Sequence, residues 1–122
     1  MKQKLYLIDD HPVIIEGLKK MLEGQSDLQV VGTSEDANTA MEQIPDLKPN
    51  LIMLDITLKD RSGVDLIKKF KQTYPDILIL VYSMHDENVY AERSLRAGAM
   101  GYLMKGETNA RVLLAIRQVL GG

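Results

Sequence analysis

Residues 51–55 read LIMLD, and this stretch indicates the fold because four apolar residues are followed at once by an acid. Residues 5–10, LYLIDD, repeat the same order near the start of the chain. A short run that is apolar throughout is typical of a parallel β-strand covered on both faces. Three further short runs, at residues 28–31, 77–81 and 101–103, are apolar or rich in β-forming residues. The sequence therefore predicts five strands.

Helical patterns occupy the intervals between these strands. Pro12 precedes apolar residues at helical spacing and suits a first helical turn. Asp36 suits the N-cap of the second helix, and Gly98 suits the end of the fourth. The third and fifth helical patterns cover residues 67–74 and 110–120. Strand and helix thus alternate five times, which predicts an α/β fold with a doubly wound parallel sheet and helices on both faces.

The composition is that of a globular protein that folds without a metal or a disulfide. Of its 122 residues, 45% are hydrophobic and 26% are charged. Lys and Arg number 15 against 17 Asp and Glu, and this balance argues against a nucleic-acid-binding module. The absence of cysteine excludes a disulfide scaffold, a zinc ribbon and a thiol nucleophile. No apolar run approaches the roughly 20 residues of a membrane span, and the N-terminus does not have the pattern of a signal peptide. We therefore expect a single domain over residues 1–122, located in the cytoplasm and without a membrane partner.

Polar and charged residues follow the predicted strands at one kind of place. Asp9 and Asp10 end the first strand, Asp55 ends the third, Ser83 follows the fourth and Lys105 follows the fifth. In a doubly wound sheet, ligands bind in the crevice at these carboxyl ends. If the strand order is 2-1-3-4-5, the first and third strands are neighbours, and the three carboxylates converge.

Three converging carboxylates retain a proton or bind a cation. At ~5 Å and an effective dielectric constant near 20, each carboxylate pair costs about 3 kcal/mol. Carboxylates, a carbonyl and waters form an oxygen site that suits Mg²⁺ better than zinc. With Mg²⁺, the Lys105 ammonium and the Ser83 hydroxyl at hand, the Asp55 carboxylate could accept a phosphoryl group.

Five motifs occur in order along the chain. They are DDHP at residues 9–12, LD at residues 54–55, Gly63 eight positions after Asp55, Ser83, and GYLMK at residues 101–105. With these motifs the chain resembles a response-regulator receiver domain of two-component signalling over essentially its whole length. The resemblance implies the flavodoxin-like receiver fold, with strand order 2-1-3-4-5 and five flanking helices.

The resemblance also implies which residues hold the phosphoryl group and the metal. Asp55 would be the phosphoacceptor, taking the phosphoryl group from a phosphohistidine on a sensor histidine kinase. Asp10 and Asp55 would bind Mg²⁺ directly, Asp9 would act through water, and the backbone carbonyl of Thr57 would complete the protein ligands. Such a domain is not a conventional enzyme, because it catalyses only its own phosphoryl transfer and dephosphorylation.

Three more residues would couple phosphorylation to an output surface. Lys105 would pair with the phosphoryl group, Ser83 would be the switch hydroxyl that moves to a phosphoryl oxygen, and Tyr102 would reorient as Ser83 moves. The surface that changes would lie around the fourth helix, the fifth strand and the fifth helix. The apolar residues of the fifth helix, at 112–120, cover more than one face. We expect either a well-buried helix or a partner surface for a homodimer or an attached domain.

Residues 83–87 and 91–99 are similar to the NarL/FixJ (LuxR-type) branch in particular. Regulators of this branch usually continue into a helix-turn-helix domain that binds DNA and regulates transcription. We expect this chain to be the N-terminal part of such a regulator, with a linker able to begin at Gly121 and Gly122. A stand-alone receiver that acts by protein–protein interaction or in a phosphorelay is the alternative.

The chain departs from the family pattern at two positions. Lys59 and Gly106 stand where the family often has proline. The first change places a cation near the acceptor, and the second weakens the expectation of a cis peptide bond, because a non-proline cis bond costs ~3 kcal/mol. Both bear on loop geometry and phosphoryl lifetime, because neither removes a reacting group.

Two other classes of function remain as alternatives. A flavodoxin-like cofactor carrier would need a phosphate cradle after the first strand, where Asp9 and Asp10 would repel a flavin phosphate. A phosphohydrolase with a nucleophilic Asp usually has a second Asp two positions on, where this chain has Thr57. The two histidines are too few for a metal cluster, so we expect His11 on the solvent side of the acidic site and His85 to shape water access.

Overall fold

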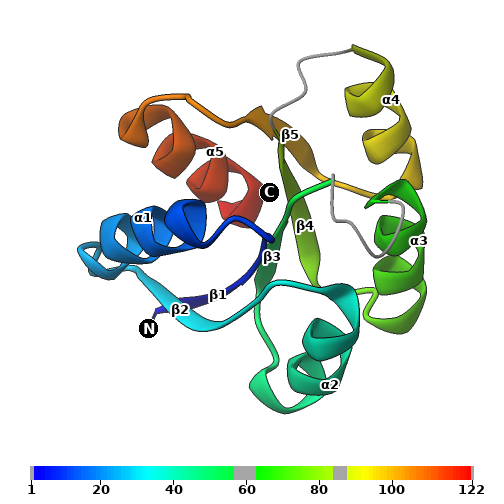
Figure 1. Ribbon diagram of the computed structural model, residues 1–122, viewed down its shortest axis with the longest axis horizontal. Helices are drawn as coiled ribbons and strands as arrows, with labels where there is room; N and C mark the ends of the chain where they lie inside the picture. Colours follow the sequence, from blue (N-terminus) through cyan, green and yellow to red (C-terminus); the bar gives the residue numbers. More distant parts are fainter. Residues whose placement is uncertain (1, 57–62, 84–87, 122) are drawn as a thin grey trace.

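The computed structural model describes residues 2–56, 63–83 and 88–121, which form a single five-stranded parallel sheet (Figure 1). The strand order is β2-β1-β3-β4-β5, as the receiver resemblance implies. The strands are β1 (Gln3–Ile8), β2 (Leu28–Ser34), β3 (Leu51–Leu54), β4 (Leu78–Ser83) and β5 (Gly101–Met104). Parallel pairing brings the carboxyl ends of all five strands to one edge.

The helices cover the two faces of this sheet. Figure 1 shows α1 and α5 on one face and α2, α3 and α4 on the other. Their bounds are α1 (Pro12–Glu23), α2 (Ala37–Leu47), α3 (Gly63–Thr73), α4 (Asn88–Ala97) and α5 (Asn109–Gly121). The prediction of a doubly wound α/β fold is confirmed.

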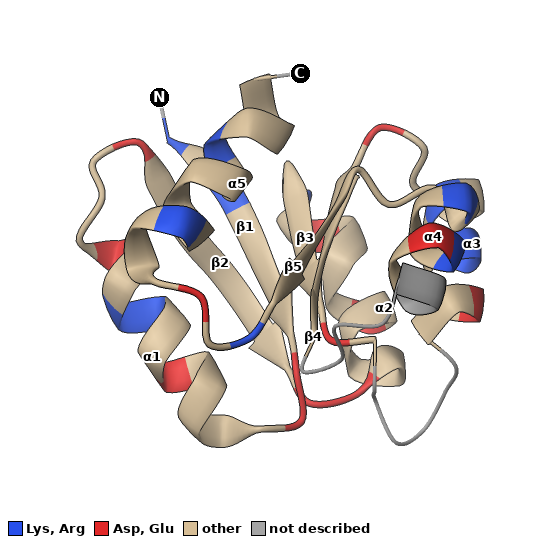
Figure 2. Cartoon of the chain, turned by 90° about the horizontal axis from the view of Figure 1, so that it is seen from above, with Lys and Arg blue, Asp and Glu red and all other residues tan. Residues whose placement is uncertain are grey.

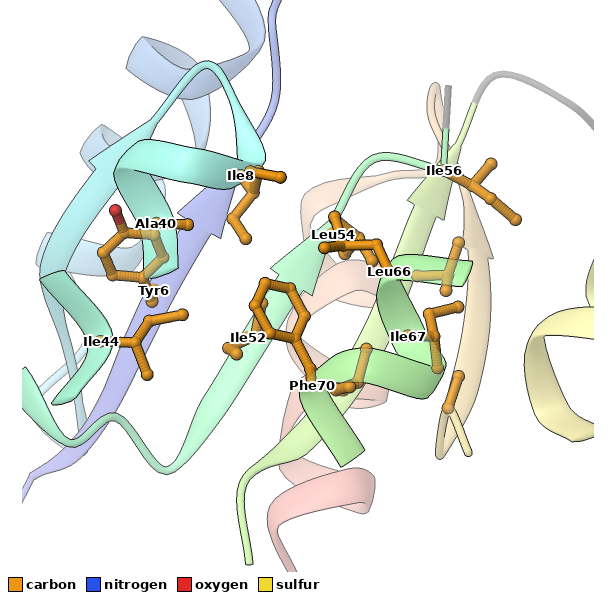
Figure 3. Close-up of a cluster of buried hydrophobic side chains, with 14 residues drawn as sticks. Tyr6, Ile8, Ala40, Ile44, Ile52, Leu54, Ile56, Leu66, Ile67 and Phe70 are labelled. Atoms are coloured by element: carbon orange, nitrogen blue, oxygen red, sulfur yellow. The ribbon is translucent and has the colours of Figure 1, made fainter. Parts of the chain in front are cut away.

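Alternation along each strand divides the buried residues into two cores. Leu5 and Leu7 of β1 pack with α1 and α5, whereas Tyr6 and Ile8 point to the opposite face. On that opposite face, Figure 3 shows Phe70 of α3 next to residues of β3. Both cores consist mainly of fully buried aliphatic side chains. The sheet is thus held rigid from both sides, which fixes the positions of the residues at its carboxyl edge.

Several elements differ in length from the sequence expectation. β2 was expected at residues 28–31 but continues to Ser34. All six residues of β1 pair with residues of β2, and the pairing shifts by one residue between Leu5 and Tyr6. β4 likewise includes Ser83 as its last residue, where Ser83 was expected to follow the strand. The second helix runs through Pro45 to Leu47. Polar strand ends and a proline within a helix carry no apolar periodicity, so the pattern could not mark them.

The fifth helix is buried along one stripe. Val112 and Ile116 are buried against the sheet, while the side chain of Leu114 is 54% exposed. α5 is therefore not buried on all sides. Over the residues that the structure describes, no helix has both the length and the apolar character required to cross a membrane.

Candidate functional site

Parallel pairing of β1 and β3 brings three carboxylates to one point of the carboxyl edge. Ile8 pairs with Leu54, so that Asp9 and Asp55 come next on neighbouring strands. The amide of Asp55 donates to the carbonyl of Ile8 over 2.9 Å, and this extends the ladder beyond the strands. Asp9 is 3% exposed and Asp55 is 1% exposed. The expected convergence of carboxylates from distant positions is therefore present.

Lys105 delivers a buried positive charge to these carboxylates. Its amide donates to the carbonyl of Ser83 over 2.6 Å, which anchors the residue after β5 to the end of β4. Its Nζ lies 2.8 Å from Oδ2 of Asp9 and 3.1 Å from Oδ2 of Asp55. Burial alone would lower the pKa of Lys105, but the hydrogen bonds and charges of Asp9 and Asp55 outweigh burial and raise the pKa above its ordinary value. The site thus keeps an ammonium between two acids at neutral pH.

His11 borders the acidic site with a side chain that is 46% exposed, as expected, and its ring nitrogen also contacts the carboxylates. The residue is the N-cap of α1, yet its side chain makes no capping hydrogen bond to the helix. Its Nδ1 lies 2.7 Å from Oδ1 of Asp9, 3.1 Å from Oδ1 of Asp10 and 3.4 Å from Oδ2 of Asp55. Sequence reasoning placed His11 beside the acidic site but missed these contacts, because its position after two acids does not reveal the direction of its ring.

The carboxylate oxygens fit a divalent cation. One donor atom from each of Asp9, Asp10, His11 and Asp55 lies within 4.8 Å of every other. Among the described residues, the buried atoms Oδ2 of Asp9 and Oδ1 of Asp10 accept no hydrogen bond of normal geometry. The first oxygen lies 2.8 Å from Nζ of Lys105 and the second 3.1 Å from Nδ1 of His11, so each has a nitrogen nearby without a hydrogen bond of normal geometry. A buried carboxylate oxygen without a hydrogen bond is costly, and a hard cation would relieve that cost.

Ser83 lies on β4, the neighbour of β3, and Tyr102 lies on β5, the strand beyond β4. Ser83 is fully buried as the last residue of β4 and pairs with Met104. Tyr102 is half-buried, pairs with Val81 and packs against the core on the α2, α3 and α4 face. In Figure 2, acidic segments gather at the carboxyl edge of the sheet, next to the basic segment that follows β5. The predicted site residues that the structure describes therefore lie at one edge, except Tyr102, which lies two residues before the end of β5.

Steric limits explain glycine at two positions that the sequence analysis singled out. A Cβ atom on Gly63 would collide with the backbone and side chain of Ile56, the residue directly after Asp55. Gly106 has a φ of 95°, which L-residues with side chains rarely adopt and which proline cannot adopt. The described residues contain no cis peptide bond, which agrees with the weaker expectation of a cis bond between Lys105 and Gly106. Thr57, Lys59 and His85 lie outside the described residues.

Comparison with known proteins identifies the family that the chain matches. Residues 5–117 match the response regulator receiver domain family. The transcriptional regulatory protein MctR from Rhizobium johnstonii is 35% identical over 121 residues, which are 99% of this chain and 56% of that protein. The chain spans about half the length of the curated relatives it matches.

Two solved structures extend the likeness to three dimensions. A two-component response regulator of the LuxR family from Aurantimonas sp. SI85-9A1 superposes with a TM-score of 0.93 at 29% identity, covering 100% of this chain and 87% of that one. RcsB from Salmonella enterica serovar Typhimurium, bound to the promoter rprA in the presence of the phosphomimetic BeF3⁻, superposes with a TM-score of 0.88 at 25% identity. That match covers 96% of this chain and 67% of RcsB.

Proposed function

The chain belongs to the family of response regulator receiver domains, whose general function is a phosphorylation switch, and we propose that Asp55 is the residue that accepts the phosphoryl group. The observation that carries this assignment is the position of its carboxylate. Oδ2 of Asp55 lies 3.1 Å from the buried ammonium of Lys105, at the point where Asp9 and Asp10 converge. Positive charge beside an acceptor favours the approach of an anionic group, and Lys105 supplies part of it.

The transfer is a displacement at phosphorus. A carboxylate oxygen of Asp55 forms the new O–P bond while the P–N bond to a donor phosphohistidine breaks. The electron pair of the broken bond stays on the leaving nitrogen, which takes up a proton. Lys105 remains protonated throughout, because Asp9 and Asp55 raise its pKa, and it neutralises charge on the phosphoryl oxygens.

We assign a divalent cation to the same edge, with Mg²⁺ as the expected ion. Asp10 and Asp55 would bind it directly, Asp9 would hold it through water, and the Thr57 carbonyl remains an expectation from the family resemblance. When bound, the ion would neutralise the carboxylates and polarise the phosphoryl group. The support from this chain is the buried Oδ1 of Asp10, which accepts no hydrogen bond of normal geometry, and the four donor atoms within 4.8 Å.

Ser83 and Tyr102 are proposed as the residues that report phosphorylation. The hydroxyl of Ser83 would donate to a phosphoryl oxygen, and Tyr102 would change its packing in response. Their positions at the end of β4 and within β5 support this proposal, because a shift there reaches α4 and α5 directly. The chain would then catalyse its own phosphorylation and dephosphorylation and no other reaction.

We further propose that the chain is the receiver part of a longer cytoplasmic transcription regulator. Its curated relatives are about twice as long as this chain, and a chain without cysteine suits a reducing compartment. The partners would be a sensor histidine kinase and a second copy of the regulator, and DNA would be bound only through a separate helix-turn-helix domain. A stand-alone receiver that acts through protein contacts is the alternative.

The test of Asp55 is phosphorylation by a small phosphodonor with Mg²⁺, followed by intact mass measurement. The wild-type protein should gain one phosphoryl group that is stable in acid and labile in base. Asp55→Asn should gain none, whereas the control Asp76→Asn, which changes an exposed carboxylate at the other end of the sheet, should behave as wild type. Equal phosphorylation of Asp55→Asn would refute the assignment.

A further inference from the structure

The imidazole of His11 occupies the centre of the acidic site. Three carboxylate oxygens, one from each of Asp9, Asp10 and Asp55, surround its Nδ1 at 2.7–3.4 Å. The Lys105 ammonium, which is a donor, also lies 3.2 Å from Nδ1, so this nitrogen stands among three acceptors and one donor, and its own role depends on the tautomer. Nδ1 therefore borders the space that a cation bound to the same oxygens would occupy.

The spacing of these donor atoms is that of ligands around one ion. Ligands that neighbour each other in an octahedron with bonds of 2.0–2.1 Å lie about 3 Å apart. Nδ1 of His11 lies at nearly this separation from the oxygens of all three acids. By these distances the ring nitrogen lies where a further protein ligand to an ion held by these acids would stand.

His11 can also leave the site without damage to the fold. Its side chain is 46% exposed and does not cap α1, so turning the ring into solvent breaks no helix cap. Nζ of Lys105, 3.2 Å from Nδ1, keeps its ion pairs with Asp9 and Asp55 whether or not the ring is present. The residue thus has two available states, one inside and one outside the acidic site.

The nature of the cation decides between these two states. Mg²⁺ takes oxygen ligands and retains waters, so it gains little from an imidazole nitrogen. Cations such as Co²⁺ bind imidazole strongly and tolerate mixed nitrogen and oxygen ligands. We propose that His11 sets which divalent cation this site binds: its ring must leave for Mg²⁺ but stays as a nitrogen ligand for a borderline cation such as Co²⁺. The inference rests on the proposed cation site at Asp10 and Asp55 and adds a residue that selects among ions.

The proposal predicts shifts of opposite sign for the two ions. In His11→Ala, the site loses an internal competitor, and Mg²⁺ should bind several-fold more tightly. The same variant loses a nitrogen ligand, and Co²⁺ should bind at least about tenfold more weakly. Binding is measured by calorimetry with each chloride salt. The visible absorption of Co²⁺ provides a second readout, which should change in the variant because the ligand set changes.

Two control variants separate the possible outcomes. Val13→Ala changes an 83% exposed side chain two positions along the chain and should leave both affinities unchanged. Asp10→Asn should weaken both ions. If His11→Ala shifts both affinities in the same direction, or neither, His11 does not select the cation, although the site itself stands. If the wild-type protein binds neither ion, the proposed cation site is wrong, and the selection by His11 fails with it.

Discussion

Lys105 and Asp55 form a buried ion pair, with Nζ 3.1 Å from Oδ2 and the two side chains 4% and 0% exposed. The pair joins residues that are 50 positions apart and come from loops after β5 and β3. Because Asp9 shares the same ammonium, removal of Lys105 would leave two buried carboxylates without their cation. Both the stability of the site and its response to phosphorylation are therefore expected to depend on this one side chain.

The first prediction concerns alkaline pH. The pKa of Lys105 is raised above 10.5 in the folded protein, so its contribution to the free energy of unfolding is fully present below pH 10.5. Above that pH the unfolded chain loses its proton first, and the contribution is lost as pH rises through the folded pKa. Urea unfolding at pH values on either side of 10.5 should show a shallower decline for Lys105→Met than for wild type. Lys69→Met, an exposed lysine of α3, is the control and should decline as wild type; equal slopes for all three proteins would contradict the prediction.

A second prediction separates phosphorylation from output. Lys105→Ala should still accept a phosphoryl group on Asp55, because the nucleophile is unchanged. The variant should show a reduced change at α4, β5 and α5, because no ammonium follows the phosphoryl oxygens. Amide chemical shifts recorded with and without a phosphodonor measure this change, and intact mass confirms that both proteins are phosphorylated. A full response in Lys105→Ala would show that the lysine is not coupled to the output surface.

A third prediction concerns the metal ligand at the end of β1. Asp10→Ala should abolish Mg²⁺ binding at millimolar concentration, because it removes the buried oxygen that lacks a hydrogen bond. The chain has no tryptophan, so tyrosine fluorescence or amide shifts report the titration. Glu23→Ala, which removes an exposed carboxylate at the other end of α1, is the matched control. Identical titration curves for Asp10→Ala and wild type would exclude Asp10 as a ligand.

A fourth prediction tests the core behind the site. Phe70 is 1% exposed and packs between α3 and the sheet, with its ring centroid 6.2 Å from that of Tyr74. Phe70→Ala should lower the free energy of unfolding by about 3–5 kcal/mol, because it removes a large buried side chain and leaves a cavity. Phe70→Leu should cost clearly less. Urea unfolding at neutral pH measures both, and a loss below about 1 kcal/mol for Phe70→Ala would mean that the core closes around the gap.

Much of the site could be predicted because it depends on strand ends. Asp9, Asp10, Asp55 and Lys105 each follow an apolar run, and parallel pairing alone brings such positions together. His11 could not be predicted in the same way, because its role depends on one side-chain rotamer and on a helix cap that it does not make. The length of β2 was also missed, since its second half is an edge segment of mixed polarity.

The contact between Gly63 and Ile56 has a consequence for how this protein can evolve. The first residue of α3 lies against the backbone that follows the proposed acceptor, and no side chain fits between them. None of the other nineteen amino acids can therefore replace Gly63 unless the segment after Asp55 moves as well. A residue with no chemical group of its own thus limits the routes by which the neighbourhood of the acceptor can diversify.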